Sequence, residues 1–329
     1  MTLEIPQAPD PEDQSSPGNQ DSGPPPIIPE FKRGSVLWRM GGILREMRPA
    51  QWVKNAFVLA PVVFAKQITH PSIIISAAGA FGVFCLLASA VYTMNDLVDV
   101  EADRVHPKKR YRPIASGRVP IALGKLLAVV LVVAALGGAM LGPWKFVATV
   151  VGYLVLQIAY SFGLKKIAYV DVGCIAAGFV LRVLAGSYAV KVPPSGYMLA
   201  CTALLALFLG FGKRRHELAG ANAAKQRAAL EQYSPAVLTT ALAVTGFGSV
   251  AVYLAYTLDA GTQAFFDSPW LWATAIHPLF GVVRFLQLVV GRPKAESPTQ
   301  EMLRDTPFMM NLMLYAAEII VIVYRLRPS

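Results

Sequence analysis

Four side chains that can ligate a metal ion follow the second long apolar stretch of the chain. Asn95, Asp96, Asp99 and Asp103 all stand in the segment 92–104. If this segment is helical, Asn95, Asp99 and Asp103 recur every four residues and stay within an arc of about 80°, with Asp96 at its edge. Mg²⁺ prefers carboxylate oxygens and often binds through one or two of them together with substrate phosphates. The spacing therefore predicts a Mg²⁺ site formed by these four residues at the end of a helix.

A strongly basic segment comes directly after the acidic one. Arginine binds phosphate oxygens through parallel hydrogen bonds, and lysine binds them as a point charge. An acidic metal site followed by a basic loop is the arrangement that a diphosphate bound with Mg²⁺ requires. An excess of basic residues also marks loops that do no more than stay on the cytoplasmic side of a membrane. The candidate phosphate-binding residues here are Lys108, Lys109, Arg110, Arg112 and Arg118.

Further charged side chains stand within or at the ends of other apolar stretches. Arg182 lies in the middle of one of them, where a lone cation costs at least about 2.5 kcal/mol. It therefore needs an anionic substrate, an acid or a backbone carbonyl beside it. Lys54 and Asn55 enter the first stretch and are placed to reach the same site. The other candidates for substrate binding are Tyr160, Lys165, Asp171, Lys213, Arg214, Arg215 and Glu217.

The apolar stretches between these charges define the class of protein. Of the 329 residues, 55% are hydrophobic and 15% are charged, against roughly 25% charged in soluble domains. This composition excludes an ordinary soluble domain and predicts an all-α polytopic membrane protein. A helix needs about 20 apolar residues to cross a bilayer. We expect nine spans, at 53–68, 72–94, 121–142, 144–162, 169–190, 196–212, 236–258, 269–290 and 307–325.

The basic residues divide unequally between the two sides that nine spans would create. Twenty-two Lys and Arg fall on the side of the N-terminus and five on the other side. Cytoplasmic loops carry such an excess, so we expect a plasma-membrane protein with the N-terminus and the acidic mouth in the cytoplasm and the C-terminus outside. The net charge of +10 is also typical of nucleic-acid binding. Because the charges lie between apolar runs, we expect lipid headgroups and anionic substrates as partners instead, and no nucleic acid.

Two regions of different composition are apparent. Residues 1–30 contain eight prolines, six acidic residues and no basic ones, which predicts a disordered cytoplasmic tail. Residues 31–329 form the expected nine-helix transmembrane catalytic domain. The three cysteines and four histidines show no metal-ligand spacing. The sequence leaves the oligomeric state open, a homo-oligomer included.

The acidic motif, in this membrane setting, resembles that of the UbiA superfamily of intramembrane prenyltransferases. The pattern NDxxDxxxD, here Asn95 to Asp103, and the pair Tyr160 and Lys165 match that superfamily. The resemblance covers about residues 45–325 and implies nine transmembrane helices around a central cavity, with Mg²⁺ holding a diphosphate. Superfamily members typically carry a second motif, DxxxD, after the sixth helix, whereas this chain has KRRHE at 213–217. The resemblance therefore implies a basic phosphate-binding cluster in place of a second metal site.

Four segments are similar to those of a particular group within the superfamily, namely RPAQWVKN, NDLVDVEADRVHPKKRYRPIASG, YSFGLKK…DV and KRRHEL. Those enzymes transfer 5-phosphoribose from phosphoribosyl diphosphate (PRPP) to decaprenyl phosphate, for the arabinan of actinobacterial cell walls. One alternative is a prenyltransferase that moves a prenyl group from its diphosphate to an aromatic acceptor. Another is a transporter or channel, which would show inverted repeats and helices broken at the midplane.

Overall fold

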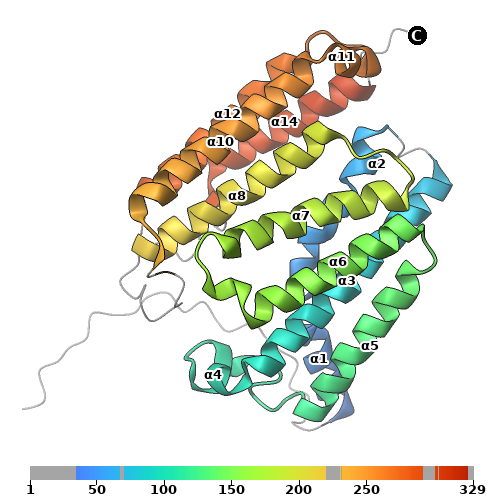
Figure 1. The fold of residues 1–329 in the computed structure, drawn as a ribbon, viewed down its shortest axis with the longest axis vertical. Helices are drawn as coiled ribbons and strands as arrows, with labels where there is room; N and C mark the ends of the chain where they lie inside the picture. Colours follow the sequence, from blue (N-terminus) through green and yellow to red (C-terminus); the bar gives the residue numbers. More distant parts are fainter. Residues whose placement is uncertain are drawn as a thin grey trace, which may run out of the picture.

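A computed structural model describes residues 35–66, 70–219, 230, 232–291, 301–302 and 304–324. Within these ranges the chain is helical and contains no strand (Figure 1). The expected disordered tail at 1–30 lies outside the described residues and stays a prediction. In chain order the elements are α1 (Val36–Glu46), η1 (Pro49–Val58), α2 (Ala60–Phe64), α3 (Pro71–Val98), α4 (Val100–Val105), η2 (Lys109–Tyr111), α5 (Ile121–Ala139), α6 (Trp144–Phe162), η3 (Leu164–Lys166), α7 (Val170–Ala189), α8 (Gly196–Ala219), α10 (Pro235–Leu258), α11 (Ala260–Phe266), η5 (Leu271–Ala275), α12 (Ile276–Gly291) and α14 (Thr306–Tyr324).

Seven helical stretches in the described part of the chain are long and apolar enough to cross a membrane. They are α3, α5, α6, α7, α8, α10 and Leu271–Val289, which joins η5 to α12. In α14 the apolar stretch is shorter, Thr306–Ile322. The first expected span is instead the 3₁₀ helix η1 followed by the five-residue α2, where Pro61 stands in the first turn and begins a new helix. The all-helical membrane fold is thus confirmed, whereas the number of nine spans is not.

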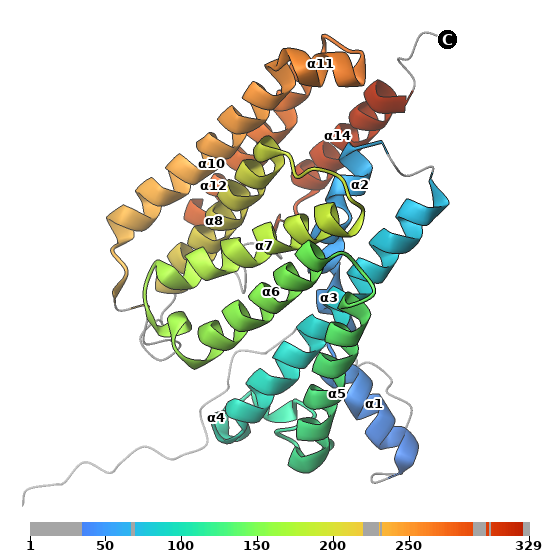
Figure 2. The same ribbon diagram turned by 45° about the vertical axis from the view of Figure 1, so that its right-hand side comes forward.

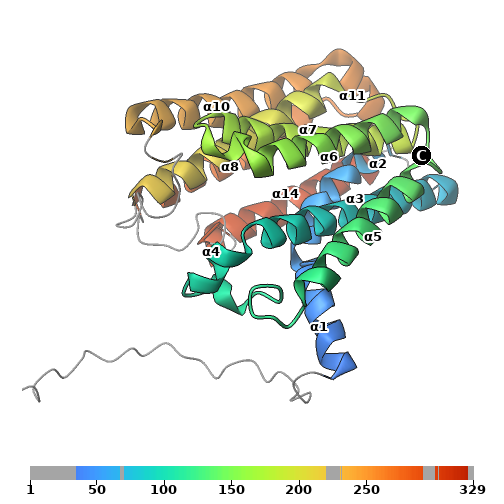
Figure 3. The same ribbon diagram turned by 60° about the horizontal axis from the view of Figure 1, so that its bottom comes forward.

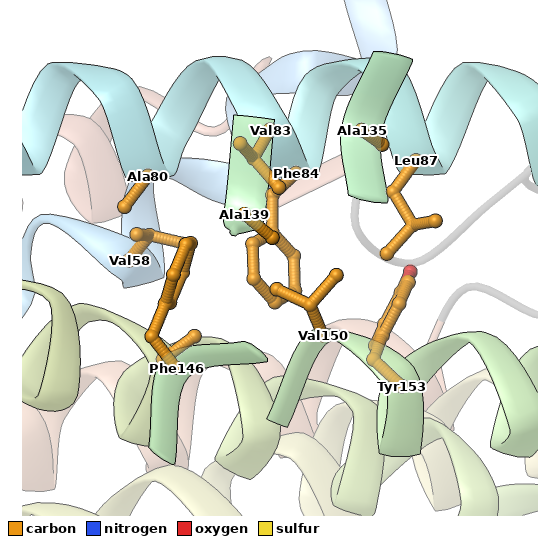
Figure 4. Close-up of a cluster of buried hydrophobic side chains, with 11 residues drawn as sticks. Val58, Ala80, Val83, Phe84, Leu87, Ala135, Ala139, Phe146, Val150 and Tyr153 are labelled. Atoms are coloured by element: carbon orange, nitrogen blue, oxygen red, sulfur yellow. The ribbon is translucent and has the colours of Figure 1, made fainter. Parts of the chain in front are cut away.

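The two largest hydrophobic clusters of the described residues both include side chains of α7. In the first cluster, Phe84 of α3 lies between side chains of α5 and α6, and its ring centroid is 5.2 Å from that of Tyr153 (Figure 4). The second cluster joins α8 to α10 and α12, with the rings of Phe208 and Phe285 4.8 Å apart. Ala185 of α7 belongs to the first cluster and Val172 to the second. Accordingly α7 lies between α6 and α8 (Figure 2).

The close approach of η1 to α7 depends on a glycine. A Cβ atom at Gly186 would collide with the carbonyl oxygen of Val58, which is fully buried. Small residues allow such backbone contacts between membrane helices. The contact holds η1 against α7 one turn from Arg182 and so brings Asn55 next to that arginine.

The acidic segment lies where α3 ends. Asp99 is the single residue between α3 and α4, with φ −92° and ψ 9°, and it caps the end of one helix and the start of the next. In Figures 1 and 2, α4 and the turn between α6 and α7 lie at one end of the long helices, and α2 and α11 lie at the opposite end. Helix α1 extends away from the long helices near α3 and α5 (Figure 3). The predicted polar residues of several loops are thereby gathered at one end of the bundle.

Candidate functional site

Two of the four predicted metal ligands, Asp96 and Asp103, form ion pairs with arginines. Asp96 and Asp103 are buried, at 3% and 2% exposure. Arg112 joins them, because its Nη1 lies 3.0 Å from Oδ1 of Asp96 and 2.5 Å from Oδ2 of Asp103. Arg48 donates to both carboxylate oxygens of Asp96, at 2.6 and 2.5 Å, and Nζ of Lys109 lies 3.8 Å from Oδ1 of Asp103. The charges of these two acids are therefore compensated within the protein.

Asp99 is more open. Its side chain is 41% exposed, and Nζ of Lys165 lies 3.8 Å from its Oδ1. Asn95 precedes it by one helical turn, and its carbonyl accepts a 2.9 Å hydrogen bond from the amide of Asp99. The side-chain oxygens of Asn95 and Asp99 thus belong to one face of α3.

The donor set fits a metal that is shared with a phosphorylated substrate. In the part of the chain that the structure describes, no three His, Cys, Asp or Glu residues are grouped to hold a metal ion. One carboxylate and one amide oxygen are nevertheless sufficient for Mg²⁺, which usually keeps several water ligands and binds substrate phosphates directly. Asn95 and Asp99 therefore fit Mg²⁺ bound together with a diphosphate, and do not fit a closed protein cage.

Arg182, in the second half of α7, is a buried cation with 7% exposure. Its Nε donates to Oδ1 of Asn55 at 2.9 Å, its Nη2 to the hydroxyl of Tyr153 at 2.7 Å and its Nη1 to the carbonyl of Gly178 at 2.9 Å. Of the three neighbours that the sequence left open for Arg182, namely an anionic substrate, an acid and a backbone carbonyl, the carbonyl is present. Among the described residues, no carboxylate forms an ion pair with this guanidinium. Its positive charge is solvated by dipoles alone, which favours an anion beside it.

Other cations surround the same region. Burial, followed by the charges of Lys213, Arg182 and Arg48, lowers the pKa of Lys54. Lys54 lies in η1, outside the seven apolar spans. Arg48 also lies 5.0 Å from the ring centroid of Tyr92, one turn before Asp96. These contacts connect the cations to the end of α3 and create a strongly positive region there.

The charged residues at 213–217, near the end of α8, lie on two different faces of the helix. Arg214 is buried, with its Nε 3.0 Å from Oδ2 of the fully buried Asp171, and it also pairs with Glu217. The hydroxyl of Tyr233 donates to Oδ1 of Asp171, and burial raises the pKa of this tyrosine so that it keeps its proton. The neighbouring Lys213 lies about 100° further around the helix, and its Nζ is 3.9 Å from Oε1 of Glu217. The structure thus places Asp171, Arg214 and Glu217 in a network that ties α7 to α8.

Three other predicted cations contact protein groups. Nε of Arg118 donates to the carbonyl of Trp38 at 2.8 Å, and its guanidinium lies 5.2 Å from the indole centroid. Arg110 donates to the hydroxyl of Tyr111 at 2.8 Å. Arg215 donates to the hydroxyl of Thr239 at 3.4 Å. Arg118 therefore holds α1 in place, whereas Arg110 is exposed and Arg215 is half-buried. Tyr160, near the end of α6, is half-buried.

A polar hollow of about 320 Å³ lies on the other side of Asp96. Its lining residues are Arg45, Arg48, Asp96, Lys108, Tyr111, Arg112 and Pro113. The sequence predicted Lys108 and Arg112 for phosphate binding but missed Arg45, Arg48 and Tyr111. One signal was present, because Arg45 and Arg48 directly precede the first apolar stretch, where a cation can face the cytoplasmic site.

Glu46 is a second residue that sequence reasoning missed. It is fully buried, and neither carboxylate oxygen has a hydrogen-bond partner in the described structure. Burial first, and then the neighbouring charge of Asp96, raise the pKa of Glu46 from 4.5 to about 8. Gly42 and Glu46, four residues apart, are the buried residues of α1. An acidic residue four positions after a buried glycine, on the same face of the helix, was the signal in the sequence that could have identified Glu46 as buried.

An apolar chamber of about 580 Å³ lies between η1, α2 and α11 and the ends of α7, α8 and α10. Phe57 lines it, and its ring centroid is 4.9 Å from that of Phe179, over which Arg182 lies at 5.3 Å. The chamber thus begins close to the buried cation and extends toward the end of the bundle at α11 (Figure 1). At that end Nζ of Lys66 donates to the carbonyl of Phe265 at 2.7 Å. This arrangement fits an anionic head at Arg182 with an apolar chain behind it.

Comparison with known proteins identifies a family and relatives that cover most of the chain. The model of the UbiA prenyltransferase family matches residues 56–311. A decaprenyl-phosphate phosphoribosyltransferase of Mycobacterium tuberculosis is 36% identical over 286 residues, covering 85% of this chain and 93% of that protein. One of Corynebacterium glutamicum is 36% identical over 253 residues, covering 74% of this chain and 75% of that protein.

Solved structures with the same fold include a UbiA homolog from Archaeoglobus fulgidus. Its complex with GPP and Mg²⁺ superimposes with a TM-score of 0.64 at 19% identity, covering 86% of this chain and 99% of that one. Its complex with DMAPP and Mg²⁺ gives a TM-score of 0.63, also at 19% identity, covering 87% and 100%. At this level of identity the likeness establishes the helical architecture.

Proposed function

The chain belongs to the UbiA prenyltransferase family, and we propose that it is a Mg²⁺-dependent polyprenyl-phosphate phosphoribosyltransferase. It transfers 5-phosphoribose from PRPP to decaprenyl phosphate, as a precursor for cell-wall arabinan. The observation that carries this proposal is the buried guanidinium of Arg182, whose hydrogen-bond partners among the described residues are Asn55, Tyr153 and the carbonyl of Gly178. The charges of Arg182 and Lys213 both act on Lys54. A phosphorylated acceptor supplies an anion for the guanidinium of Arg182. The relatives named above, at 36% identity, support the same assignment.

The reaction exchanges one bond at the anomeric carbon of ribose. The bond from C1 to the diphosphate oxygen breaks, and diphosphate leaves with the electron pair. A phosphate oxygen of the polyprenyl phosphate forms the new bond to C1 from the opposite face, which inverts the anomer. The carbon becomes oxocarbenium-like between the two events, as in other glycosyl transfers. The protein must therefore hold two anions on opposite faces of one sugar.

The donor side is formed by the end of α3 and the loop after α6. Asn95 and Asp99 hold Mg²⁺ there, and Lys165, 3.8 Å from Asp99, binds the same diphosphate. Bound Mg²⁺ offsets the negative charge that grows on the leaving diphosphate. Tyr160 lies one helical turn before Lys165 and flanks this side. Asp96 and Asp103 act indirectly, because they hold Arg48 and Arg112 in place.

The acceptor side is formed by η1, α7 and the end of α8. Lys54, Arg182 and Lys213 hold the acceptor phosphate, and Asn55 orients the guanidinium of Arg182. A phosphate monoester has a second pKa of about 6 and is already anionic at neutral pH, so the attack needs no strong general base. At about 30 Å³ per non-hydrogen atom, the apolar chamber holds roughly 20 carbon atoms of the tail, and the rest extends into the bilayer.

Four of the predicted substrate residues act as positioning residues. Arg214 pairs with both Asp171 and Glu217 and so fixes α8 against α7, which places Lys213 at the acceptor side. Arg118 holds α1 through Trp38. Substitution of these residues is expected to act through the placement of other side chains.

The membrane orientation follows from charge. The end of the bundle with α4 and the α6–α7 turn carries most of the basic loops (Figure 1), and by the positive-inside rule it faces the cytoplasm. The donor PRPP then enters from the cytoplasm, and the polyprenyl phosphate enters from the plasma membrane. The C-terminal side of α14 faces outward.

Two parallel reactions with the purified full-length protein test this assignment. The first contains Mg²⁺, PRPP labelled in the ribose, and decaprenyl phosphate. The second contains Mg²⁺, a labelled prenyl diphosphate and an aromatic acid. We expect label in the organic phase of the first reaction, abolished by EDTA. Product in the second reaction alone would overturn the proposal in favour of aromatic prenyl transfer.

A further inference from the structure

We infer that the polar hollow lined by Arg45, Arg48, Lys108 and Arg112 binds a phosphate monoester, and that its occupant is the 5-phosphate of the phosphoribosyl donor. This inference rests on the proposed function and adds a second anion site to it. The hollow is separate from the diphosphate site at Asn95 and Asp99.

The charge of the hollow favours an anion. Four cations line it, against one carboxylate, that of Asp96. Arg48 and Arg112 already bind this carboxylate, and Arg112 also binds Asp103, so four cations stand against two carboxylates. Arg45, in the last turn of α1, is exposed and forms no ion pair with any described residue. The lining therefore keeps an excess of positive charge that a dianionic phosphate would neutralise through charge-assisted hydrogen bonds.

The size and composition of the hollow restrict the ligand. At about 30 Å³ per non-hydrogen atom, its 320 Å³ accommodates roughly ten such atoms. A phosphate group with its attached methylene and part of a sugar fits within this volume. The lining is mainly charged, with Tyr111 and Pro113 as the other members. A prenyl chain would find no apolar surface there comparable to that of the chamber.

The position of the hollow relates it to the donor site. Asn95 and Asp96 are consecutive in α3, so their side chains leave the helix about 100° apart. Asn95 and Asp99 face the proposed diphosphate, and Asp96 faces the hollow. Arg48 lies between the two, since it binds Asp96 and its charge also acts on Lys54. Two anion sites thus lie on adjacent faces of one helix.

This separation matches one kind of donor. PRPP carries a diphosphate on C1 and a phosphate on C5 of the same ribose, whereas a prenyl diphosphate carries all its charge at one end. A second anion site beside the first would therefore select the phosphoribosyl donor. The hollow gives a physical reason for this specificity within a family named for prenyl transfer.

Binding of ribose 5-phosphate to the full-length protein in detergent tests the inference without turnover. Arg45→Gln is compared with Arg39→Gln, which removes an exposed arginine of the same helix that does not line the hollow. We expect Arg45→Gln to weaken ribose 5-phosphate binding about tenfold, the loss of one charge-assisted contact. Arg39→Gln should bind as the wild type does. In turnover, Arg45→Gln should raise the KM for PRPP and leave kcat and the KM for decaprenyl phosphate unchanged.

A lipid headgroup offers the same phosphate chemistry, because the neighbouring face of α1 exposes Val36, Leu37, Met40 and Leu44. A second arm therefore measures thermal stabilisation by phosphatidylglycerol micelles. Equal ribose 5-phosphate affinity in the two variants would overturn the inference, as would a loss confined to phosphatidylglycerol. Because the binding arm requires no transfer reaction, its result is independent of whether the proposed function itself holds.

Discussion

At the scale of single residues, two acids of the motif have different surroundings. Asp99 is 41% exposed beside Lys165, whereas Asp103 is buried against Arg112 and Lys109. The four-residue spacing places both on one face only if the helix is unbroken. Because α3 ends at Val98 and the loop after α4 brings Arg112 back to the motif, Asp103 has a protein partner instead.

This division predicts different phenotypes for two matched substitutions. Asp99→Asn removes a metal-binding carboxylate and should lower kcat at least 100-fold, with a higher Mg²⁺ requirement. Asp103→Asn leaves Arg112 with one carboxylate fewer and should lower the melting temperature while the Mg²⁺ requirement stays near that of the wild type. Activity measured across a Mg²⁺ titration, with melting curves for both proteins, checks this. Equal shifts in the Mg²⁺ requirement would contradict the division.

Glu46 predicts a pH dependence of stability. Its pKa is about 8 in the folded protein and 4.5 as the ordinary value, so between these values the folded state binds a proton that the unfolded state has lost. Its contribution is complete below pH 4.5 and is lost as the pH rises through 8. Glu46→Gln stays neutral and should lack this decline. Melting temperatures from pH 6 to 9 should diverge, with the variant more stable at the alkaline end. Parallel curves would show that Glu46 ionises normally.

Much of the site could be predicted from residue types, because buried or juxtamembrane charges are costly unless they are used. Arg182 was singled out on that ground, and its isolation from described carboxylates agrees with it. The pairing of Asp171 with Arg214 could not be foreseen, because it depends on how α7 and α8 pack. Arg45 was missed for a similar reason, since its partners come from a loop more than 60 residues later.

At the scale of elements, the contact between η1 and α7 sets the acceptor side. The sequence predicted eight of the helical stretches from apolar length alone, but it could not distinguish a regular span from the 3₁₀ helix that replaces the first one. An apolar composition indicates that a segment lies in the bilayer, but it does not specify the type of helix. The 3₁₀ conformation of η1 depends on Pro49, Pro61 and the packing at Gly186.

Gly186→Ala is expected to separate η1 from α7. The added methyl group would meet the backbone of Val58 and not a movable side chain, so the cost should be about 1–3 kcal/mol. Lys54 and Asn55 would move with η1, and the KM for the polyprenyl phosphate should rise. Gly173→Ala on the same helix is the control, because no atom lies within 4 Å of its added Cβ. Similar melting temperatures and KM values for the two variants would argue against this contact.

At the scale of the whole molecule, charge and apolar surface divide between the two ends of the bundle. The donor residues lie near α4, and the chamber extends to α11 (Figure 1). A reaction between a water-soluble diphosphate and a lipid phosphate requires this polarity, because each substrate approaches from its own phase.

The orientation is tested by cysteine labelling in intact cells. Arg104→Cys in α4 should react with a membrane-impermeant thiol reagent only after permeabilisation, whereas Asp267→Cys after α11 should react directly. Both positions are exposed. Cys85 and Cys174 are buried and Cys201 is half-buried, so labelling of the wild-type protein measures the background. The reverse pattern would place the donor site outside the cell.

The central claim concerns which carbon–oxygen bond breaks, and isotope tracing measures that directly. Decaprenyl phosphate labelled with ¹⁸O at its bridging and non-bridging phosphate oxygens is incubated with PRPP, Mg²⁺ and the full-length protein, and the products are analysed by mass spectrometry. Phosphoribosyl transfer leaves the prenyl carbon–oxygen bond intact, so we predict that all the ¹⁸O is retained in the lipid product and none is found in the released diphosphate. Labelled inorganic phosphate, released from a lipid that has lost its ¹⁸O, would show that the prenyl group moves and would contradict the account.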